Sequence, residues 1–207
     1  AAWFMSKEAW AFISGGLLYI LFGVLFLFQL IKIRIRNRRL AREEWLPLVD
    51  EEGAVTGKAP RSVIHNGSRL LHPVVHLHVI SPRKELLLQK RPLSKAIQPG
   101  KWDTAVGGHI SAGENLETAL KRETAEEIGL KEFSARFLKK YHWQYEVENE
   151  LVYVFVSHDY KCVGVQSDEV DELRFWTRQE IERNLGKGTF TPNLEHDYDL
   201  LKREKLL

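Results

Sequence analysis

The sequence has a single cysteine, Cys162, among its 207 residues. One cysteine cannot form an internal disulfide, and it cannot supply the ligands of a cysteine-based structural zinc site. The chain also has no internal repeat and no low-complexity linker. Its 44% hydrophobic and 28% charged residues are typical of a globular protein, so the length predicts one ordinary domain plus an appendage.

Charged residues are absent from the 23-residue run between Ala9 and Ile31. A helix of that length reaches roughly 34 Å at about 1.5 Å per residue, which is enough to span a bilayer core of roughly 30 Å. A buried core helix would be shorter and would usually keep a polar stripe. The run therefore predicts one transmembrane helix.

Basic residues follow this run rather than precede it. Residues 1–42 contain seven lysines or arginines and one acid, Glu8, a net charge of +6, which leaves −4 for the remainder. A cleaved signal peptide would carry its positive charge before the apolar stretch, so we expect a retained anchor. By the positive-inside rule the C-terminal domain of this single-pass protein lies in the cytoplasm. The basic segment is explained by its role in setting membrane topology and by contact with anionic lipid. We therefore expect no nucleic acid polymer as a partner.

The expected organisation is an anchor with its basic juxtamembrane segment at 1–42 and a folded domain at 43–207. Residues 46–60 alternate around Glu52-Gly53 and predict a small hairpin. Strands are expected at 74–80, 86–89 and 151–156, and helices at 116–128, 177–185 and 194–205. The 74–80 strand has His76 and His78 on one face, where we interpret both as ordinary strand residues. This mixture predicts an α/β sandwich.

Three glutamates gather within the helix expected at 116–128. Glu123, Glu126 and Glu127 are spaced i, i+3 and i+4, so they share one helix face opposite an apolar stripe. Like charges this close repel one another, and a hard divalent cation with oxygen ligands would remove the conflict. A solvated acidic face is the alternative for the glutamates taken alone.

The flanking residues favour the metal site. Gly108 is followed after five residues by Glu114, and after seven more by Arg122-Glu123; Glu126-Glu127 and Gly129 complete the pattern. This pattern resembles the Nudix box, with Thr124 where the family usually has an aliphatic residue. The resemblance covers most of 45–207 and implies an α/β/α sandwich with a mixed sheet, here preceded by the transmembrane helix.

The same resemblance implies roles for individual residues. Glu123, Glu126, Glu127 and the Gly108 carbonyl would bind magnesium or manganese, and Arg122 would orient the glutamates. The general base would be Glu126 or Glu127 in the box, or Glu150 outside it. The implied reaction is attack by water on a small-molecule diphosphate, such as a nucleoside diphosphate linked to another group. Dimers are frequent in the family, which makes a homodimer a further expectation.

A second resemblance, to the isopentenyl-diphosphate isomerase branch of the superfamily, lies partly upstream of the box. In that branch three histidines and two acids bind a further metal, and two basic residues face the diphosphate. The matching residues here are His65, His72, His109, Glu148 and Glu150 for the metal, and Arg91 and Lys95 for the diphosphate. This set implies a second divalent-metal site, and local packing of the histidines is the alternative.

The isomerase needs a cysteine where this chain has Gly107, and glycine cannot carry a proton. Cys162 is distant in the sequence, and we interpret it as a small buried hydrophobe. We therefore expect a membrane-anchored Nudix hydrolase. Isopentenyl-diphosphate isomerase activity and a diphosphate-sensing module without turnover are the two alternatives.

Overall fold

The computed structural model describes residues 6–146, 148–161, 163–165 and 168–207, so Cys162 lies outside the described residues. Contacts between Cα atoms divide the chain into two compact units, residues 1–43 and 44–207. The assignment of 1–42 as a separate anchor stays a prediction.

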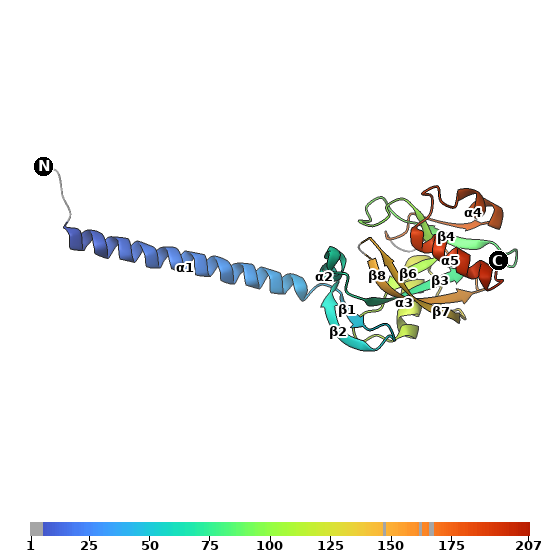
Figure 1. Ribbon diagram of the computed structural model, residues 1–207, viewed down its shortest axis with the longest axis horizontal. Coiled ribbons are helices and arrows are strands. Elements are labelled where there is room, and N and C mark those ends of the chain that lie inside the picture. Colours follow the sequence, from blue (N-terminus) through green and yellow to red (C-terminus); the bar gives the residue numbers. More distant parts are fainter. Residues whose placement is uncertain (1–5, 147, 162, 166–167) are drawn as a thin grey trace. The chain divides into compact units, whose positions relative to one another are not determined.

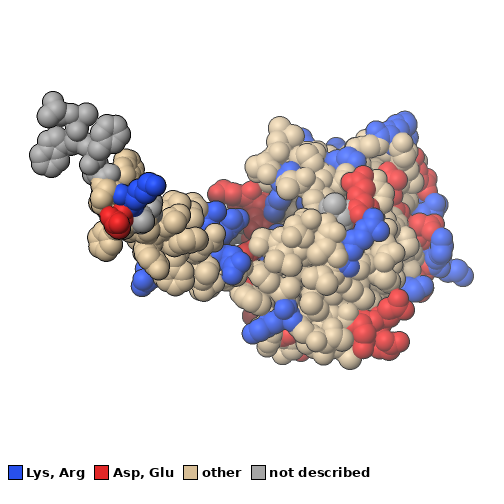
Figure 2. All heavy atoms as spheres, turned by 60° about the vertical axis from the view of Figure 1, so that its left-hand side comes forward, with Lys and Arg blue, Asp and Glu red and all other residues tan. Residues whose placement is uncertain are grey.

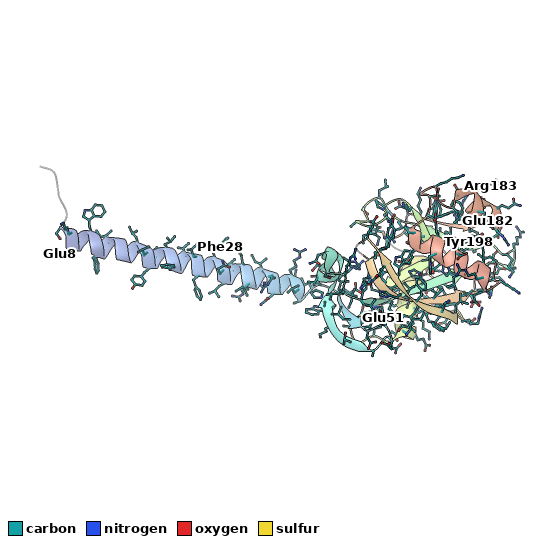
Figure 3. The ribbon with its side chains drawn as sticks, viewed as in Figure 1. Glu8, Phe28, Glu51, Glu182, Arg183 and Tyr198 are labelled. Carbon is teal, nitrogen blue, oxygen red and sulfur yellow. The ribbon has the colours of Figure 1, made fainter. Side chains whose placement is uncertain are left out.

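Helix α1, Lys7–Leu40, forms most of the first unit. Ser6 caps its N-terminus by accepting a hydrogen bond from the Ala9 amide at 3.3 Å. Its apolar side chains point outward, as Phe28 does in Figure 3, and they form an uncharged band in Figure 2. Among the described helices, α1 is the one long and apolar enough to cross a membrane, although a signal sequence passes the same test.

The second unit contains the other helices and strands (Figure 1). The strands are β1 Trp45–Val49, β2 Val55–Pro60, β3 His72–Val79, β4 Leu86–Lys90, β5 Trp102–Thr104, β6 Val106–His109, β7 Arg136–Tyr145, β8 Glu148–Ser157 and β9 Glu172–Trp176. The helices are α2 Arg61–Val63, the π-helical turn η1 Ile64–Ser68, α3 Leu116–Ile128, α4 Arg178–Asn184 and α5 Pro192–Arg203.

A four-stranded mixed sheet in the order β6-β3-β8-β7 organises this unit. Strand β3 pairs parallel with β8 and antiparallel with β6, so β3 and β8 are the two central strands. Val75 and Leu77 of β3 pack with Leu120 and Ile128 of α3 on one face. On the opposite face, Val74 and the β8 valines pack with Leu200 of α5. The sheet is therefore sandwiched between helices, as the α/β/α prediction requires.

A three-stranded sheet, β5-β4-β9, and the hairpin β1-β2 complete the unit. Leu86 and Leu88 of β4 pack with Trp176 of β9 and with Leu194 and Tyr198 of α5, which makes a second core. Helix α5 therefore packs against both sheets. Its Leu200 contacts the mixed sheet, and its Leu194 and Tyr198 contact the three-stranded sheet.

The predicted hairpin, strands and helices are confirmed, with end shifts of a few residues. The strand expected at 151–156 is the central part of β8, which lies between β3 and β7 and is mostly buried. The short α2-η1 segment was not predicted, because its five π-helical residues, IHNGS, have no apolar periodicity.

Candidate functional site

A cleft of about 230 Å³ lies where α3 meets β6. Its lining residues are Glu44, Arg61, Gly107, Gly108, His109, Arg122, Glu123, Glu126, Glu127 and Glu169. Asn115 caps α3 by accepting the Thr118 amide at 2.8 Å, and Gly129 ends the helix with a positive φ of 71°. The Nudix-like stretch thus folds into a strand, a loop and a capped helix around one cavity.

Gly108 lets the backbone of β6 approach Glu123. A Cβ added at Gly108 would lie 2.1 Å from the Glu123 carboxyl carbon, which is far inside van der Waals contact. The glycine therefore fits this position because the glutamate side chain occupies the space a methyl group would take. Burial raises the pKa of the Glu123 carboxyl, and the neighbouring Glu126 adds to the effect although Arg122 opposes it.

Glu127 is held from two directions. Its Oε2 accepts a hydrogen bond from Gln89 Nε2 at 2.9 Å and from the Gly107 amide at 3.1 Å. Burial, followed by the charge of Glu123, raises the pKa of Glu127 to about 8. A carboxylate pair that is buried against like charge is the setting in which a divalent cation is strongly favoured.

The sequence placed the three glutamates on one face opposite an apolar stripe, and this is wrong for Glu127. The Glu127 side chain is buried with the stripe residues Leu120, Thr124 and Ile128, whereas Glu126 is exposed. The reason is that Glu127 is three residues after Thr124 and seven after Leu120, which puts it on the same side of α3, where the Gly107 amide of β6 donates to its carboxylate. Thr124 tolerates its buried position because its hydroxyl donates to the Leu120 carbonyl at 2.6 Å.

Arg122 organises the acidic groups. Its guanidinium donates to both oxygens of Glu114 at 3.0 and 2.8 Å, and also to Glu123 at 2.8 Å and Glu126 at 3.3 Å. A fifth bond reaches the His109 carbonyl at 3.0 Å. Glu114 itself accepts the Ser111 amide, so it supports the loop. One cation thus fixes the relative positions of the loop and two candidate metal ligands.

His65, His72 and His109 come together, with one ring nitrogen of each within 4.8 Å of the others. His65 Nε2 lies 3.0 Å from His109 Nε2, and His72 Nδ1 lies 3.0 Å from the Leu70 carbonyl. Burial lowers the pKa of His72 to about 4, and burial also lowers the pKa of His65 and His109. Neutral imidazoles are the form that binds metal, so the geometry fits either a metal or a hydrogen-bonded histidine pair.

Glu148 and Glu150 lie beside this cluster rather than within it. Glu150 Oε1 is 3.9 Å from His72 Nε2, and its Oε2 accepts from Asn193 at 3.4 Å. Glu148 accepts from the Trp143 indole at 3.3 Å. Burial and the charge of Glu148 raise the pKa of Glu150 to about 7, and burial likewise raises that of Glu148.

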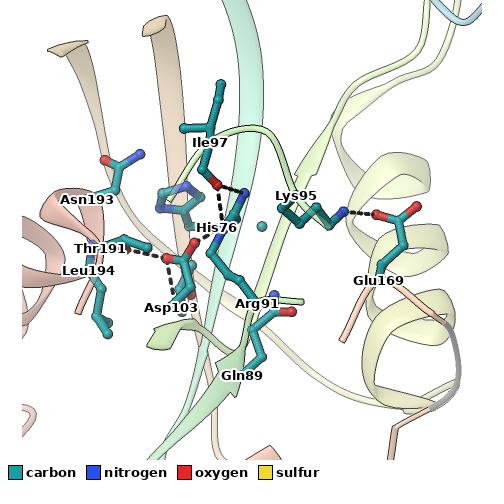
Figure 4. A network of polar contacts seen from close by, with 12 residues as sticks. His76, Gln89, Arg91, Lys95, Ile97, Asp103, Glu169, Thr191, Asn193 and Leu194 are labelled. Atoms are coloured by element: carbon teal, nitrogen blue, oxygen red, sulfur yellow. Dashed lines mark hydrogen bonds and ion pairs between the residues drawn. The ribbon is translucent and has the colours of Figure 1, made fainter. Parts of the chain in front are cut away.

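Arg91 and Lys95 are both held by partners (Figure 4). Arg91 donates to Asp103 at 2.9 Å and to the Ile97 carbonyl at 3.1 and 3.3 Å. Lys95 donates to Glu169, a cleft residue, at 2.7 Å. The Arg91 guanidinium is therefore fixed in direction, and the Lys95 ammonium is held against a carboxylate that lines the cleft.

Two histidines that the sequence left as ordinary strand residues share a buried acid. His76 Nδ1 lies 2.7 Å and His78 Nε2 3.0 Å from the same Asp197 oxygen, and the Tyr141 hydroxyl donates to the other oxygen at 2.7 Å. Asp197 is on α5, 121 residues beyond His76, so no sequence spacing could pair them. Burial opposes the charge on His76, but the Asp197 carboxylate outweighs it and raises the pKa to about 9.

This ion pair predicts a pH dependence of stability. Despite burial, the His76 and His78 rings hold the pKa of Asp197 well below its ordinary value of 3.8, while the pKa of His76 rises from 6.5 to about 9. The pair's contribution is therefore fully present between pH 3.8 and 6.5, and it is lost as the pH rises through about 9 or falls well below 3.8. Asp197→Asn should destabilise the fold by roughly 3 kcal/mol at pH 6.5 and by less at pH 9.

Thermal unfolding of the parent protein and of the Asp197→Asn variant, at both pH values, measures this loss of stability. Asp199→Asn is the matched control, because Asp199 is on the same helix but is exposed and pairs with Arg203 at the surface. It should change stability by less than about 0.5 kcal/mol at either pH. Equal losses for Asp197→Asn at pH 6.5 and 9 would contradict the predicted ion pair.

Comparison with known proteins identifies the family. The NUDIX domain model matches residues 70–194. A Nudix hydrolase of Listeria monocytogenes is 31% identical over 152 residues, covering 72% of this chain and 89% of the relative. An isopentenyl-diphosphate Delta-isomerase of Corynebacterium efficiens is 38% identical over 88 residues, but the match covers only 42% of this chain and 46% of the isomerase.

A solved structure shares the fold. The crystal structure of DR0079 from Deinococcus radiodurans superposes with a TM-score of 0.66 at 22% identity, covering 77% of this chain and 98% of that protein. The family model spans the strand, loop and helix that gather Glu123, Glu127 and Arg122, so sequence and geometry agree. The chain belongs to the Nudix family and is a hydrolase that acts on diphosphate bonds.

Proposed function

We propose that this protein is a membrane-anchored, magnesium- or manganese-dependent hydrolase of an organic diphosphate, such as a nucleoside diphosphate linked to another group. The observation that carries the proposal is the carboxylate cleft, where the buried Glu127 and the half-buried Glu123 lie against β6 and Arg122 orients Glu123. Water attacks one phosphorus of the diphosphate, the bond from that phosphorus to the bridging oxygen breaks, and the other phosphate leaves.

The donor set fits a hard divalent cation. Glu123, Glu126 and Glu127 supply carboxylate oxygens, Gly108 lines the same cleft, and burial raises the pKa of both Glu123 and Glu127. The bound metal would lower the pKa of the attacking water and neutralise the leaving phosphate. Arg91 and Lys95 would bind phosphate oxygens at the other side of the site.

Two acids compete for the role of the base. Glu126 is exposed, and its carboxylate pairs with Arg122 at 3.3 Å. Glu150 has a pKa raised to about 7, which suits proton transfer near neutral pH. Glu150→Gln and Glu126→Gln, compared as pH profiles of kcat, would distinguish them, since loss of the true base removes the acidic limb of the profile.

The second part of the proposal is that the protein is anchored in a membrane. An uncharged run at 9–31 followed by six basic residues fits a single-pass anchor with the hydrolase domain in the cytoplasm. The full chain should then remain in the membrane pellet after alkaline washing. Exposure of the 44–207 unit to protease only from the cytoplasmic side would support the orientation, and its digestion from the opposite side would contradict it.

The first experiment assays the full chain in detergent with magnesium against nucleoside, sugar-nucleotide, dinucleotide and prenyl diphosphates. We expect turnover of one class that is lost on chelation. Failure on every class with both magnesium and manganese would contradict the proposal. In that case, ligand binding that survives Glu127→Gln would favour the sensing alternative.

The isomerase alternative has one structural observation in its favour, the histidine cluster beside Glu150. Gly107 stands against it, because a glycine at the position of the isomerase cysteine leaves no group to carry the proton. Deuterium exchange from water into isopentenyl diphosphate without hydrolysis would establish isomerisation.

The histidine cluster predicts a second metal. We expect the full chain to bind zinc or manganese at pH 7 in addition to the metal of the carboxylate cleft, because burial keeps the His72 imidazole neutral at that pH. His72→Asn should weaken this binding by roughly 100-fold and leave the first site intact. Metal analysis after dialysis measures it, with His158→Asn as a control outside the cluster. Equal metal content in both variants would favour the hydrogen-bonded histidine pair.

A further inference from the structure

Two arginines line the carboxylate cleft, Arg61 and Arg122, and they differ in how many of their donors are already in use. Arg122 uses all five N–H donors of its guanidinium, on three glutamates and one backbone carbonyl. Arg61 makes one side-chain hydrogen bond within the described residues, from Nη1 to Glu44 Oε2 at 3.1 Å, and its side chain is 45% exposed. Arg61 is therefore the cleft arginine with donors still available to a ligand.

Glu44 holds Arg61 at the wall of the cleft. In addition to the side-chain pair, the Arg61 amide donates to the Glu44 carbonyl at 2.9 Å. The other carboxylate oxygen of Glu44, Oε1, accepts from the Ser111 hydroxyl at 3.1 Å, in the loop between β6 and α3. One carboxylate thus ties the Arg61 guanidinium to the loop that Arg122 and Glu114 organise.

The charge of Arg61 acts on other groups of the cleft. Burial lowers the pKa of His109, and the Arg61 charge is the next cause of that shift. The ion pair with Lys95 lowers the pKa of Glu169, and the Arg61 charge adds to the effect. Because His109 and Glu169 both line the cleft, Arg61 lies close enough to attract an anion that binds between them.

The cleft has more acidic than basic side chains. The acids that line it are Glu44, Glu123, Glu126, Glu127 and Glu169. A divalent cation would offset the carboxylates that bind it, but a diphosphate adds several negative charges of its own. Its phosphate oxygens therefore need a further donor at the cleft, and the planar fork of an arginine matches phosphate geometry.

We propose that Arg61 is a substrate-contacting residue, whose guanidinium donates a hydrogen bond to a phosphate oxygen of the diphosphate bound at the carboxylate cleft. The inference rests on the proposed diphosphate substrate. Arg61 and Glu44 precede residue 70, where the match to the NUDIX domain model begins, so this contact comes from a segment outside the matched domain. A charge-assisted bond of this kind strengthens binding by about tenfold or more.

The test measures affinity for a substrate analogue and for the metal separately. Methylenediphosphonate, a diphosphate analogue that water cannot cleave, is titrated with magnesium into the full chain in detergent by calorimetry, and magnesium alone is titrated in parallel. Arg61→Gln should weaken analogue binding by about tenfold or more, and it should leave magnesium affinity unchanged or higher because a cation has been removed from the cleft. Unchanged analogue binding, or an equal loss of both affinities, would overturn the inference.

Arg69→Gln is the matched control, because Arg69 belongs to the same segment but is exposed and donates to the Glu146 carbonyl at 3.1 Å. It should change analogue binding by less than about twofold. The Arg61→Gln change is also made in a Glu44→Gln protein, where we expect the loss of about tenfold to persist. Disappearance of the loss in that protein would mean that Arg61 serves only to neutralise Glu44.

Turnover separates this inference from the proposed hydrolysis. Arg61-dependent binding of the analogue without turnover of any diphosphate would refute the hydrolysis alone. Turnover by the parent chain, together with unchanged analogue binding by Arg61→Gln, would refute the role of Arg61 alone.

Discussion

Glu127→Gln is expected to lower kcat by roughly 10²–10³-fold while raising the stability of the metal-free protein. The loss of activity follows because the variant removes a proposed metal ligand, and metal contributes several kcal/mol to stabilising phosphoryl transfer. The gain in stability follows because burial raises the pKa of Glu127 in the folded protein to about 8, from an ordinary value of 4.5. The charged form is therefore unfavourable in the fold when no metal is bound.

The sign of this effect is set by the direction of the pKa shift. A carboxyl group whose pKa is raised by folding destabilises the protein progressively as the pH rises from about 4.5 to about 8. Glutamine carries no charge, and its amide oxygen can still accept from Gln89 and Gly107. We expect roughly 1–2 kcal/mol of stabilisation at pH 8 with a chelator present, and none at pH 4.

Thermal unfolding with and without magnesium measures the change in stability, and a turnover assay measures the change in kcat. Glu117→Gln is the matched control, since Glu117 is on the same helix but is exposed and pairs only with Lys121. It should leave both quantities nearly unchanged. A Glu127→Gln protein that is less stable at pH 8 than the parent would show that the carboxylate already has a compensating cation in the folded chain.

Gly108→Ala is expected to weaken metal binding by roughly 100-fold with little change in unfolding temperature. The added Cβ would lie 2.1 to 2.5 Å from three atoms of the Glu123 side chain. Those atoms belong to a flexible side chain, so Glu123 would rotate away and the backbone would stay in place. The predicted consequence is a lost ligand in a folded protein.

Gly107→Ala is the control for this prediction, because its methyl group would lie on the opposite face of β6, toward His76 and Thr104. Calorimetry with magnesium or manganese alone should show near-normal affinity for Gly107→Ala and a large loss for Gly108→Ala. Equal metal affinities for the two variants would mean that Glu123 does not bind the metal. A large fall in unfolding temperature for Gly108→Ala would instead show that the backbone of β6 had moved.

The sequence alone predicted the β1-β2 hairpin, the strands β3, β4 and β8, the helices α3, α4 and α5, and the spacing of the carboxylate residues. It did not predict β5, β6, β7, β9 or the α2-η1 segment. Apolar periodicity located α3, α5 and the central strand β8, because burial on one or both faces leaves a period in the sequence. The spacing of Gly108, Glu123 and Glu127 identified the metal-binding pattern, since these residues are close in the chain and their proximity follows from one loop and one helix. The sequence alone likewise excludes an internal disulfide, because there is a single cysteine, and predicts a membrane span from the uncharged run at 9–31.

The tertiary structure alone decided the contacts between distant segments. The hydrogen bonds that hold the buried Glu127, from Gln89 of β4 and the Gly107 amide of β6, join segments that are distant in the sequence. The pairing of His76 and His78 with Asp197 depends on α5 crossing the sheet more than a hundred residues later. The cleft also acquired Glu44, Arg61 and Glu169, for which no short pattern exists. The spacing of residues along the sequence shows which side chains are neighbours within one helix or strand. Side-chain contacts between distant segments depend on how the sheets and helices pack together.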